Sequence, residues 1–262
     1  MKAARFDYEK PRELGAALKL LTEAGADAKV LAGGQSLGPM LNLRLAQPAL
    51  LVDVRGLPEL GEVRDEADAV FIGACTTHAA IEDGRVPDPT QGFLRKVARG
   101  IAYRAVRNRG TVGGSLAHAD PAADWVSAMA VLDARIVVRG PQGERTVAAA
   151  DFVLGIMSTA LGEGEILVGV RVPKLSTRAR WSYWKYCRKT GEFAEAIGAF
   201  VIDPDRGWWR GVMGATEGAP VVIEDARVLD PAAVAAEAFE PGTYEHQVHA
   251  VALKRAAAAL DR

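Results

Sequence analysis

Residues Arg107–Asp124 read RNRGTVGGSLAHADPAAD, and Val30–Leu37 carry an earlier version of the same pattern, VLAGGQSL. In each segment an apolar run meets a glycine pair and then a small hydroxyl residue. Glycine has no Cβ, so consecutive peptide N–H groups can approach an anion that a side chain would keep away. A single glycine pair is weak support, because glycine pairs also make ordinary turns. Two such segments, about 80 residues apart, predict two loops that close on one diphosphate.

The same segments indicate what kind of molecule is bound. The hydroxyl groups of Ser36, Thr111 and Ser115 can donate to the anion. Neither segment reads G-x-G-x-x-G, and neither ends in the Gly-Lys-Ser/Thr of a P-loop, so no lysine is placed to reach a transferable phosphate. This pattern favours a dinucleotide that is held for the chemistry of its other end.

Two acidic residues follow the second glycine pair, in the sequence DPAAD. Asp120 is predicted to cap a helix, Pro121 to take its first position and Asp124 to lie in its first turn. An acid just beyond a phosphate-binding segment can instead accept hydrogen bonds from ribose hydroxyls. Asp124 is the better candidate for that role, because the helix does not need it as a cap. For Asp120 both interpretations stay open.

Composition places the chain among globular proteins without a polyanionic partner. Its 262 residues are 49% hydrophobic and 25% charged, enough for two or three lobes with cores of their own. The 32 basic and 33 acidic residues give a net charge of −1, whereas a nucleic-acid partner normally requires a basic excess. We find no signal peptide and no apolar run of membrane-spanning length, so we expect a cytoplasmic protein without membrane insertion.

Cysteine and histidine positions predict no metal site in this chain. Cys75 and Cys187 cannot supply the four thiolates of an iron–sulfur cluster. His246 and His249 share a predicted helix face, but no carboxylate and cysteine set accompanies them. His246 and His249 are expected to be surface groups, whereas His118 lies within the second glycine segment and is expected near the bound dinucleotide. The sequence also offers no nucleophile–base triad, so no catalytic residue is assigned.

Periodicity and turn residues predict mixed helices and strands, followed by an antiparallel meander. The predicted helices are 11–23, 36–45, 76–83, 93–99, 122–132, 232–238 and 246–260. The predicted strands are 29–32, 50–54, 69–75, 135–138, 144–147, 165–172, 181–187, 196–203 and 208–216. Breaks near residue 56 and at Pro173 predict an N-terminal domain over 1–173, with subdomains of about 1–56 and 57–173, and a C-terminal domain over 174–262.

The segments AGGQSLGPMLNLRLAQP and RNRGTVGGSLAHADPAAD together resemble the FAD-binding medium subunit of the molybdenum hydroxylases, the family of carbon monoxide dehydrogenase and xanthine dehydrogenase. The resemblance covers nearly the whole chain. It implies an α+β fold, in which a two-subdomain FAD-binding domain of the vanillyl-alcohol-oxidase/PCMH type precedes a small C-terminal α+β domain with an antiparallel sheet. The implied cofactor of this chain is FAD.

The resemblance also implies which residues contact FAD. The two glycine segments would bracket the pyrophosphate, Asp124 would reach the adenosine part, and Leu167 and Lys185 would contact the flavin half. A cation at Lys185 can stabilise negative charge on the reduced ring. The implied cofactor-binding residues are Ala32, Gly33, Gly34, Gln35, Ser36, Leu37, Ile101, Thr111, Val112, Gly113, Gly114, Ser115, Asp120, Asp124, Leu167 and Lys185.

The resemblance implies partner chains as well. In relatives of this kind, a large subunit holds molybdenum–pterin and a small subunit holds [2Fe–2S] clusters. This chain would accept electrons from the clusters and pass them to an external acceptor, in a complex expected to be a dimer of heterotrimers. Two alternatives stay open, a self-sufficient PCMH-type flavin oxidoreductase and a scaffold subunit that has lost its cofactor. The substrate and the acceptor are not predicted.

Some residues depart from the family pattern or have no assigned role. Where many relatives have Asp-Tyr, this chain has Glu192-Phe193, which keeps an aromatic face but loses a hydroxyl that would steer the flavin ring or its acceptor. For Arg107 and Arg109, just before the second glycine pair, three roles stay open: docking the cluster subunit, neutralising phosphate, or lying solvated at the surface.

Overall fold

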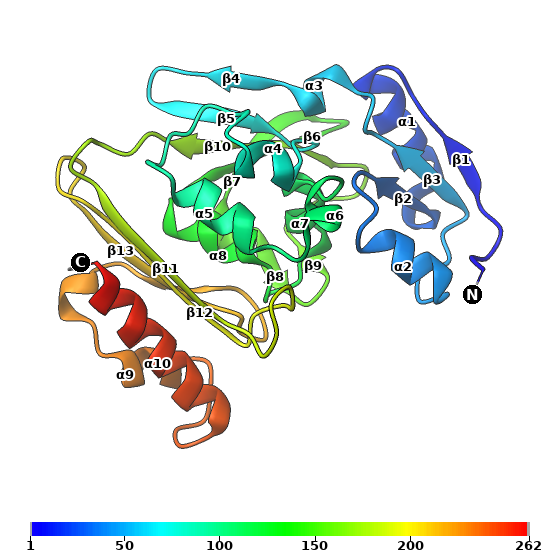
Figure 1. Ribbon diagram of the computed structural model, residues 1–262. Coiled ribbons are helices and arrows are strands. Elements are labelled where there is room, and N and C mark those ends of the chain that lie inside the picture. Colours follow the sequence, from blue (N-terminus) through cyan, green and yellow to red (C-terminus); the bar gives the residue numbers. More distant parts are fainter. Residues whose placement is uncertain (1, 261–262) are drawn as a thin grey trace.

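The computed structural model describes residues 2–260, whose strands form four sheets (Figure 1). The strands are β1 (Asp7–Glu9), β2 (Ala28–Leu31), β3 (Leu50–Asp53), β4 (Val63–Asp65), β5 (Ala69–Gly73), β6 (Arg135–Gly140), β7 (Gly143–Ala148), β8 (Val153–Gly155), β9 (Ser158–Thr159), β10 (Ile166–Pro173), β11 (Arg180–Tyr186), β12 (Ala196–Asp203), β13 (Trp208–Gly214) and β14 (Val221–Ile223). The α-helices are α1 (Leu14–Ala24), α2 (Leu37–Asn42), α3 (Pro58–Gly61), α4 (His78–Glu82), α5 (Phe93–Gly100), α6 (Arg104–Arg107), α7 (Val112–His118), α8 (Asp124–Val131), α9 (Pro231–Ala236) and α10 (Tyr244–Ala259).

The N-terminal sheet has the order β1-β3-β2, and both pairings are parallel. Helix α1 packs on it through Leu14, Ala17 and Leu21, which recur at helical spacing and are buried. Asp53, at the end of β3, accepts hydrogen bonds from the Tyr8 hydroxyl and the Arg55 guanidinium. Burial alone would raise the pKa of Asp53, but these bonds hold it well below its ordinary value. This network ties β1 to β3.

The central sheet has the order β4-β5-β10-β6-β7, and all its pairings are antiparallel. Its middle strand β10 matches the predicted strand 165–172 to within one residue, and it is buried over residues 166–170. Gly169 interrupts the apolar run for a steric reason. A Cβ there would lie 2.3 Å from the Phe71 ring, which packs across the strand.

Helix α8 lies between the central sheet and the C-terminal sheet, and every residue from Asp124 to Val131 is buried (Figure 1). A helix without a solvent-facing side belongs in the core, where its side chains pack in all directions. The sequence AMAVL in this helix and the next turn provides that apolar surface. Asp124 is the one charged side chain within α8, and its burial therefore requires partners.

The C-terminal sheet has the order β11-β12-β13-β14, an antiparallel meander as predicted. Strand β12 is buried over its whole length, because α8 covers one face of the sheet and α10 the other. Gly198 permits the close approach of α10, since a Cβ there would lie 2.7 Å from the Ala252 carbonyl oxygen. The mixture of helices and strands confirms the α+β expectation.

The structure corrects the prediction around the second glycine pair. Val112–His118 form the helix α7, with Thr111 as N-cap, and not a loop. Helix α8 begins at Asp124 and its N-cap is Ala123, so Asp120 is not the cap. Asp120 instead accepts a hydrogen bond from the Ala122 amide at 2.9 Å, closing a local turn.

Short elements elsewhere were not predicted from the sequence. These are β1, β4, β8, β9, β14, α3 and α6, each with two to four residues. The predicted domain boundaries at residues 56 and 173 stay a prediction. None of the helices between residues 2 and 260 combines the length and apolar character that crossing a bilayer requires.

Candidate functional site

The two glycine segments lie against each other, although they are far apart in sequence. A Cβ on Gly33 would lie 2.2 Å from the Arg109 carbonyl oxygen and 2.8 Å from the Gly110 Cα. A Cβ on Gly114 would lie 3.7 Å from the Ala32 Cβ. The absence of a side chain at Gly33 therefore lets two backbones meet, and the meeting point is where α2 and α7 begin.

The first segment keeps free main-chain donors. Gly34 has a left-handed φ of 71°, a conformation that favours glycine. Among residues 2–260, the N–H groups of Gly34, Gln35 and Ser36 donate to no protein acceptor, and the Gln35 side chain folds back on the Gly33 carbonyl at 3.3 Å. Leu37 follows as the first residue of α2. Consecutive free amides of this kind form an anion-binding concavity.

The second segment does not offer free amides, contrary to the expectation that both segments aim N–H groups at an anion. The Val112 and Gly113 amides donate to the carbonyls of Thr76 and Ala74, at 3.0 and 2.9 Å. The Gly114 amide donates to Thr111 Oγ1 at 3.1 Å. The segment contributes a wall that is packed against the central part of the protein, because a Cβ on Gly113 would lie 2.5 Å from the Ala74 Cβ.

His78 supports this wall from behind. Its main-chain N–H donates to the Gly110 carbonyl, and its Nδ1 accepts a hydrogen bond from Trp125 Nε1 at 2.9 Å. The proton of the neutral imidazole therefore sits on Nε2. Burial, with a smaller contribution from the charge of Arg107, lowers the pKa of His78 to about 4.

The expectation that His246 and His249 are surface groups is wrong for His249, and His78 is buried as well. His78 is 5% exposed and His249 is 1% exposed. The ring nitrogens of His249 lie 2.7 Å from the Glu245 carbonyl oxygen and 3.1 Å from the Ala215 carbonyl oxygen, so this side chain joins α10 to the end of β13. Within residues 2–260, no three His, Cys, Asp or Glu side chains are arranged to hold a metal ion.

Arg107 is not solvated at the surface, because its side chain is 11% exposed; the two other roles left open for it stay predictions. Its guanidinium bonds the Glu82 carboxylate at 2.7 Å and donates to the carbonyls of Ile101 and Ala102 at 2.9 and 3.0 Å. The hydrogen bond from Arg107 is the largest cause that holds the pKa of Glu82 below its ordinary value. Arg107 thus fixes the turn after α5, where Ala102 has a left-handed φ of 41°. Ile101 is partly buried in that turn.

Asp124 and Lys185 form an ion pair across the seam between α8 and β11. Lys185 Nζ lies 2.8 Å from Asp124 Oδ2, and the two side chains are 11% and 4% exposed. Lys185 also donates to the Gly100 carbonyl at 3.4 Å, and the Tyr183 hydroxyl donates to Asp124 Oδ1 at 2.8 Å. Burial raises the pKa of Asp124, while the charge of Lys185 and both hydrogen bonds oppose that rise.

The other predicted cofactor-binding residues lie on other elements than Asp124 and Lys185. Leu167 is buried in β10, beside the bulge between Leu167 and Gly169. Ser115 lies in α7 and is partly exposed, as is Ser36 at the start of α2. Sequence reasoning missed Tyr183. Its position two residues before Lys185 on a strand, and therefore on the same face, was the available signal.

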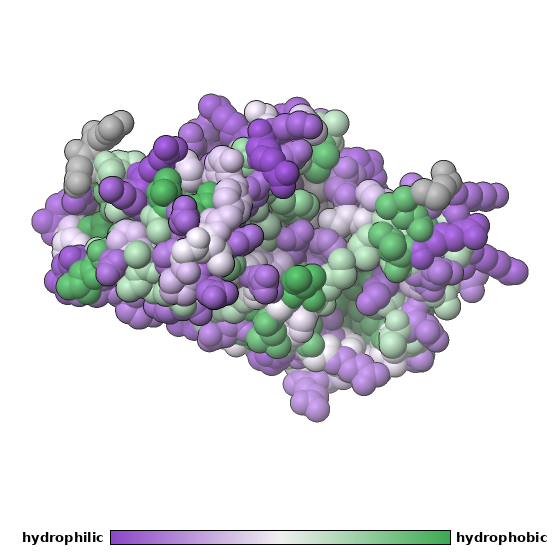
Figure 2. All heavy atoms as spheres, turned by 90° about the horizontal axis from the view of Figure 1, so that it is seen from below, coloured by the Kyte–Doolittle hydropathy of each residue, from purple (hydrophilic) through white to green (hydrophobic). Residues whose placement is uncertain are grey.

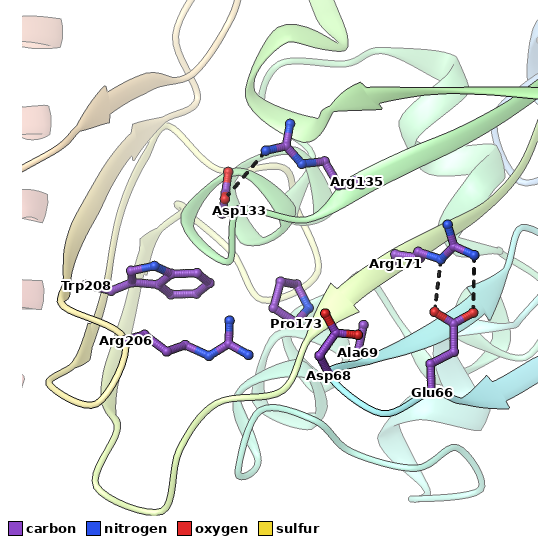
Figure 3. Close-up of a pocket in the computed structure, with 9 residues that line it drawn as sticks. All are labelled: Glu66, Asp68, Ala69, Asp133, Arg135, Arg171, Pro173, Arg206 and Trp208. Carbon is purple, nitrogen blue, oxygen red and sulfur yellow. Dashed lines mark hydrogen bonds and ion pairs between the residues drawn. The ribbon is translucent and has the colours of Figure 1, made fainter.

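A hollow of about 380 Å³ lies elsewhere, between the strand ends of the central sheet and the β12–β13 turn (Figure 3). Arg171 bonds Glu66 at 3.0 Å, and Arg206 lies over the Trp208 ring at 4.8 Å. No residue of either glycine segment lines it, so we assign it no cofactor. Its lining residues are Glu66, Asp68, Ala69, Asp133, Arg135, Arg171, Pro173, Arg206 and Trp208.

Large apolar side chains are exposed at several separate places. Leu45, just after α2, is 72% exposed, and Ile156 and Met157 at the β8–β9 turn are 67% and 61% exposed. The face seen from below shows separate hydrophobic patches among hydrophilic residues (Figure 2). The β8–β9 turn is fixed, because the Met157 amide donates to the Ala119 carbonyl at 2.9 Å, directly after α7.

Comparison with known proteins identifies relatives of this chain. The carbon monoxide dehydrogenase medium chain of Hydrogenophaga pseudoflava is 42% identical over 198 residues, which are 76% of this chain and 69% of that protein. The 6-hydroxypseudooxynicotine dehydrogenase complex subunit alpha of Paenarthrobacter nicotinovorans is 37% identical over 205 residues, which are 78% of this chain and 69% of the relative.

Solved structures agree with these relatives. A chain of carbon monoxide dehydrogenase from Hydrogenophaga pseudoflava, in a form that lacks the Mo-pyranopterin moiety of the molybdenum cofactor, matches with a TM-score of 0.91 and 35% identity, over 99% of this chain and 98% of that one. A chain of quinoline 2-oxidoreductase from Pseudomonas putida 86 matches with a TM-score of 0.83 and 32% identity, over 100% of both chains. These matches confirm the predicted fold class.

The family assignment rests on a match that covers most of the chain. Residues 4–175 match the family model described as the FAD binding domain in molybdopterin dehydrogenase. This range includes both glycine segments, Asp124 and the whole central sheet. The chain therefore belongs to the family of FAD-binding domains in molybdopterin dehydrogenases.

Proposed function

We propose that this chain is the FAD-binding, electron-transfer subunit of a molybdenum-containing hydroxylase or dehydrogenase. The observation that carries the proposal is the contact between the two glycine segments, where Gly34, Gln35 and Ser36 present free amides near the start of α7. Bound FAD supplies the electron-accepting and electron-donating chemistry, and the protein binds, orients and tunes it.

The residues present fit the diphosphate of such a cofactor. The amides of residues 34–36 would bind its oxygens, and the hydroxyls of Ser36 and Ser115 would add donors. Gly33 lets the second segment lie directly beside these amides, because the Arg109 carbonyl oxygen occupies the place where a Gly33 Cβ would be. The supporting residues of this part of the site are Ala32, Leu37, Thr111, Val112 and Gly113.

The Asp124–Lys185 pair would serve the flavin half. Two of the three N–H groups of the Lys185 ammonium donate to Asp124 and to the Gly100 carbonyl, so one N–H is left for the cofactor. Two side chains joined at 2.8 Å cannot contact opposite ends of an extended dinucleotide, so Asp124 and Lys185 would serve the same half of the cofactor, and we propose that this is the flavin half. Ile101 and Leu167 would line this half, and Asp120 the region near the end of α7.

We further propose the partners that this role requires. The names of the relatives describe a medium chain and a subunit of a dehydrogenase complex, which supports a large molybdenum-binding partner and a small [2Fe–2S] partner, arranged as a dimer of heterotrimers. The exposed apolar side chains at Leu45, Ile156 and Met157 are consistent with a chain that has partners. Electrons would pass from the clusters through FAD to an external acceptor in the cytoplasm.

Purification of the chain alone and with its partners tests the proposal. The isolated chain should carry about one FAD and show a flavin spectrum, because its glycine segments need no partner to bind the diphosphate. It should oxidise no substrate until the two partner subunits are added. A colourless chain that takes up no FAD would contradict cofactor binding, and turnover by the isolated chain would point to a self-sufficient oxidoreductase.

A further inference from the structure

Two side chains of β11 bind one buried carboxylate, that of Asp124. Tyr183 and Lys185 alternate on β11 and therefore face the same side, toward α8. Tyr183 binds Asp124 Oδ1 and Lys185 binds Asp124 Oδ2, both at 2.8 Å. Each oxygen of the carboxylate thus has its own partner, and the carboxylate cannot rotate without losing both bonds.

Aromatic packing fixes the tyrosine ring that carries this hydroxyl. The Tyr183 ring meets the Phe93 ring edge-on, with centroids 5.9 Å apart at 83°. Phe93 is fully buried and also meets Trp181 edge-on at 5.4 Å. Such contacts favour one ring orientation. The hydroxyl therefore presents a rigid donor to Asp124, whereas Lys185 alone would offer a flexible one.

We propose that Tyr183 is a positioning residue for the flavin: by holding the Asp124 carboxylate it fixes the Lys185 ammonium and so sets the reduction potential of bound FAD. The inference rests on the proposed function. A lysine ammonium is a compact point charge on a flexible stem, so its effect on a neighbouring redox group depends on where its counter-ion holds it. Tyr183 acts on FAD through Asp124 and Lys185, without touching the cofactor.

The plainer role for Tyr183 is a structural tie between β11 and α8. A structural tie would change the stability of the protein and leave the electrochemistry of the flavin unchanged. A positioning role predicts instead that the effect of Tyr183 on the potential requires the lysine charge. Residues in one hydrogen-bonded network show such coupling, whereas independent residues have additive effects.

The test is a double-mutant cycle on the FAD-loaded assembled complex. Tyr183→Phe removes only the hydroxyl, and Lys185→Met removes the charge. At a fixed potential, Tyr183→Phe should change the ratio of reduced to oxidised FAD by at least about twofold when Lys185 is present, and leave it unchanged in the Lys185→Met background. Lys185→Met by itself should lower the midpoint potential.

Tyr186→Phe is the matched control. It makes the same chemical change on the same strand, but the Tyr186 ring stacks on Trp184, at 6.3 Å, on the opposite face. It should leave the potential unchanged. No shift with Tyr183→Phe, or an equal shift in both lysine backgrounds, overturns the inference while the proposed function stands. Wild-type complex that contains no FAD overturns the proposed function itself. If Tyr183→Phe does not fold, Tyr183→Leu, which also removes the hydroxyl, takes its place in the same cycle.

Discussion

At the scale of single residues, the site depends on glycines that let two backbones touch. Gly33 has no room for a methyl group, because the Arg109 carbonyl oxygen would lie 2.2 Å from its Cβ. Gly38, in α2, has nothing within 4 Å of the corresponding position. The two glycines lie five residues apart along one short segment, so they make a matched pair for testing whether the contact is what binds FAD.

We expect Gly33→Ala to separate the two segments and to weaken FAD binding by about tenfold or more, equivalent to about 1.4 kcal/mol. Gly38→Ala should bind FAD as the wild type does. Flavin content after gel filtration and titration of apo-protein with FAD measure both variants. Equal affinity of Gly33→Ala and wild type would show that the contact between the segments is not part of the cofactor site.

At the scale of elements, α7 depends on its cap. Thr111 is buried, and its Oγ1 accepts a hydrogen bond from the Gly114 amide at 3.1 Å. Without this bond the amide, which lies in the first turn of α7, would have no acceptor within the helix. Two glycines near the start of a helix disfavour it by roughly 1 kcal/mol each relative to alanine. The cap and the contacts of α7 with the central sheet offset that cost.

Thr111→Ala should lower the free energy of unfolding by about 1–2 kcal/mol and also weaken FAD binding, because α7 forms one wall of the site. Thr243→Ala is the matched control, since Thr243 caps α10 through the His246 amide at 3.2 Å, away from both glycine segments. It should reduce stability without changing flavin affinity. Urea unfolding and FAD titration of both variants separate the two effects. An equal loss of FAD affinity in Thr111→Ala and Thr243→Ala would contradict a specific role for α7.

The sequence predicted elements well where local pattern and tertiary packing agree. Strand β10 and the meander β11–β13 have apolar runs bounded by turn residues, and both lie within a residue or two of the expected positions. Helix α7 was missed because its glycine pair disfavours a helix locally, and only the neighbouring Ala74 shows why glycine is required there. Strands such as β9 have too few residues for a local pattern and exist through pairing alone.

The candidate site was predictable to a similar degree. The glycine pairs marked the candidate diphosphate segments from the sequence alone, but the contact between the two segments is visible only in the folded chain. Asp124 and Lys185 entered through family resemblance, and they are 61 residues apart in sequence, so their ion pair could not be read from spacing. Tyr183 had no motif of its own, and its hydroxyl acquires a role only where β11 packs on α8.

At the scale of the whole molecule, His78 couples stability to pH. The His78 pKa is lowered from 6.5 to about 4 in the folded state, mainly by burial. In the unfolded chain the imidazole recovers its ordinary pKa, so between these values the unfolded state binds more protons than the folded state. Stability contributed by the neutral His78 is therefore present above pH 6.5 and is lost as pH falls toward 4.

Asp124 has the opposite effect on stability. Its pKa is raised in the folded state, so the folded state binds the proton more readily than the unfolded state does, and acidification increases the stability that Asp124 contributes. The carboxylates with lowered pKa values, such as Glu82, lose their contribution only as pH falls below their unfolded value near 4.5. Between pH 7.5 and 5, His78 is therefore the clearest source of falling stability among the shifted groups described here.

We expect the free energy of unfolding to be about 2 kcal/mol lower at pH 5 than at pH 7.5 because of His78. His78→Asn should remove most of this dependence, since the amide oxygen can accept the Trp125 Nε1 hydrogen bond near the position of Nδ1 and does not titrate. Urea unfolding followed by tryptophan fluorescence, at five pH values in this range and at constant ionic strength, measures both proteins. An equal slope in wild type and His78→Asn would mean that His78 is not held neutral behind the second glycine segment.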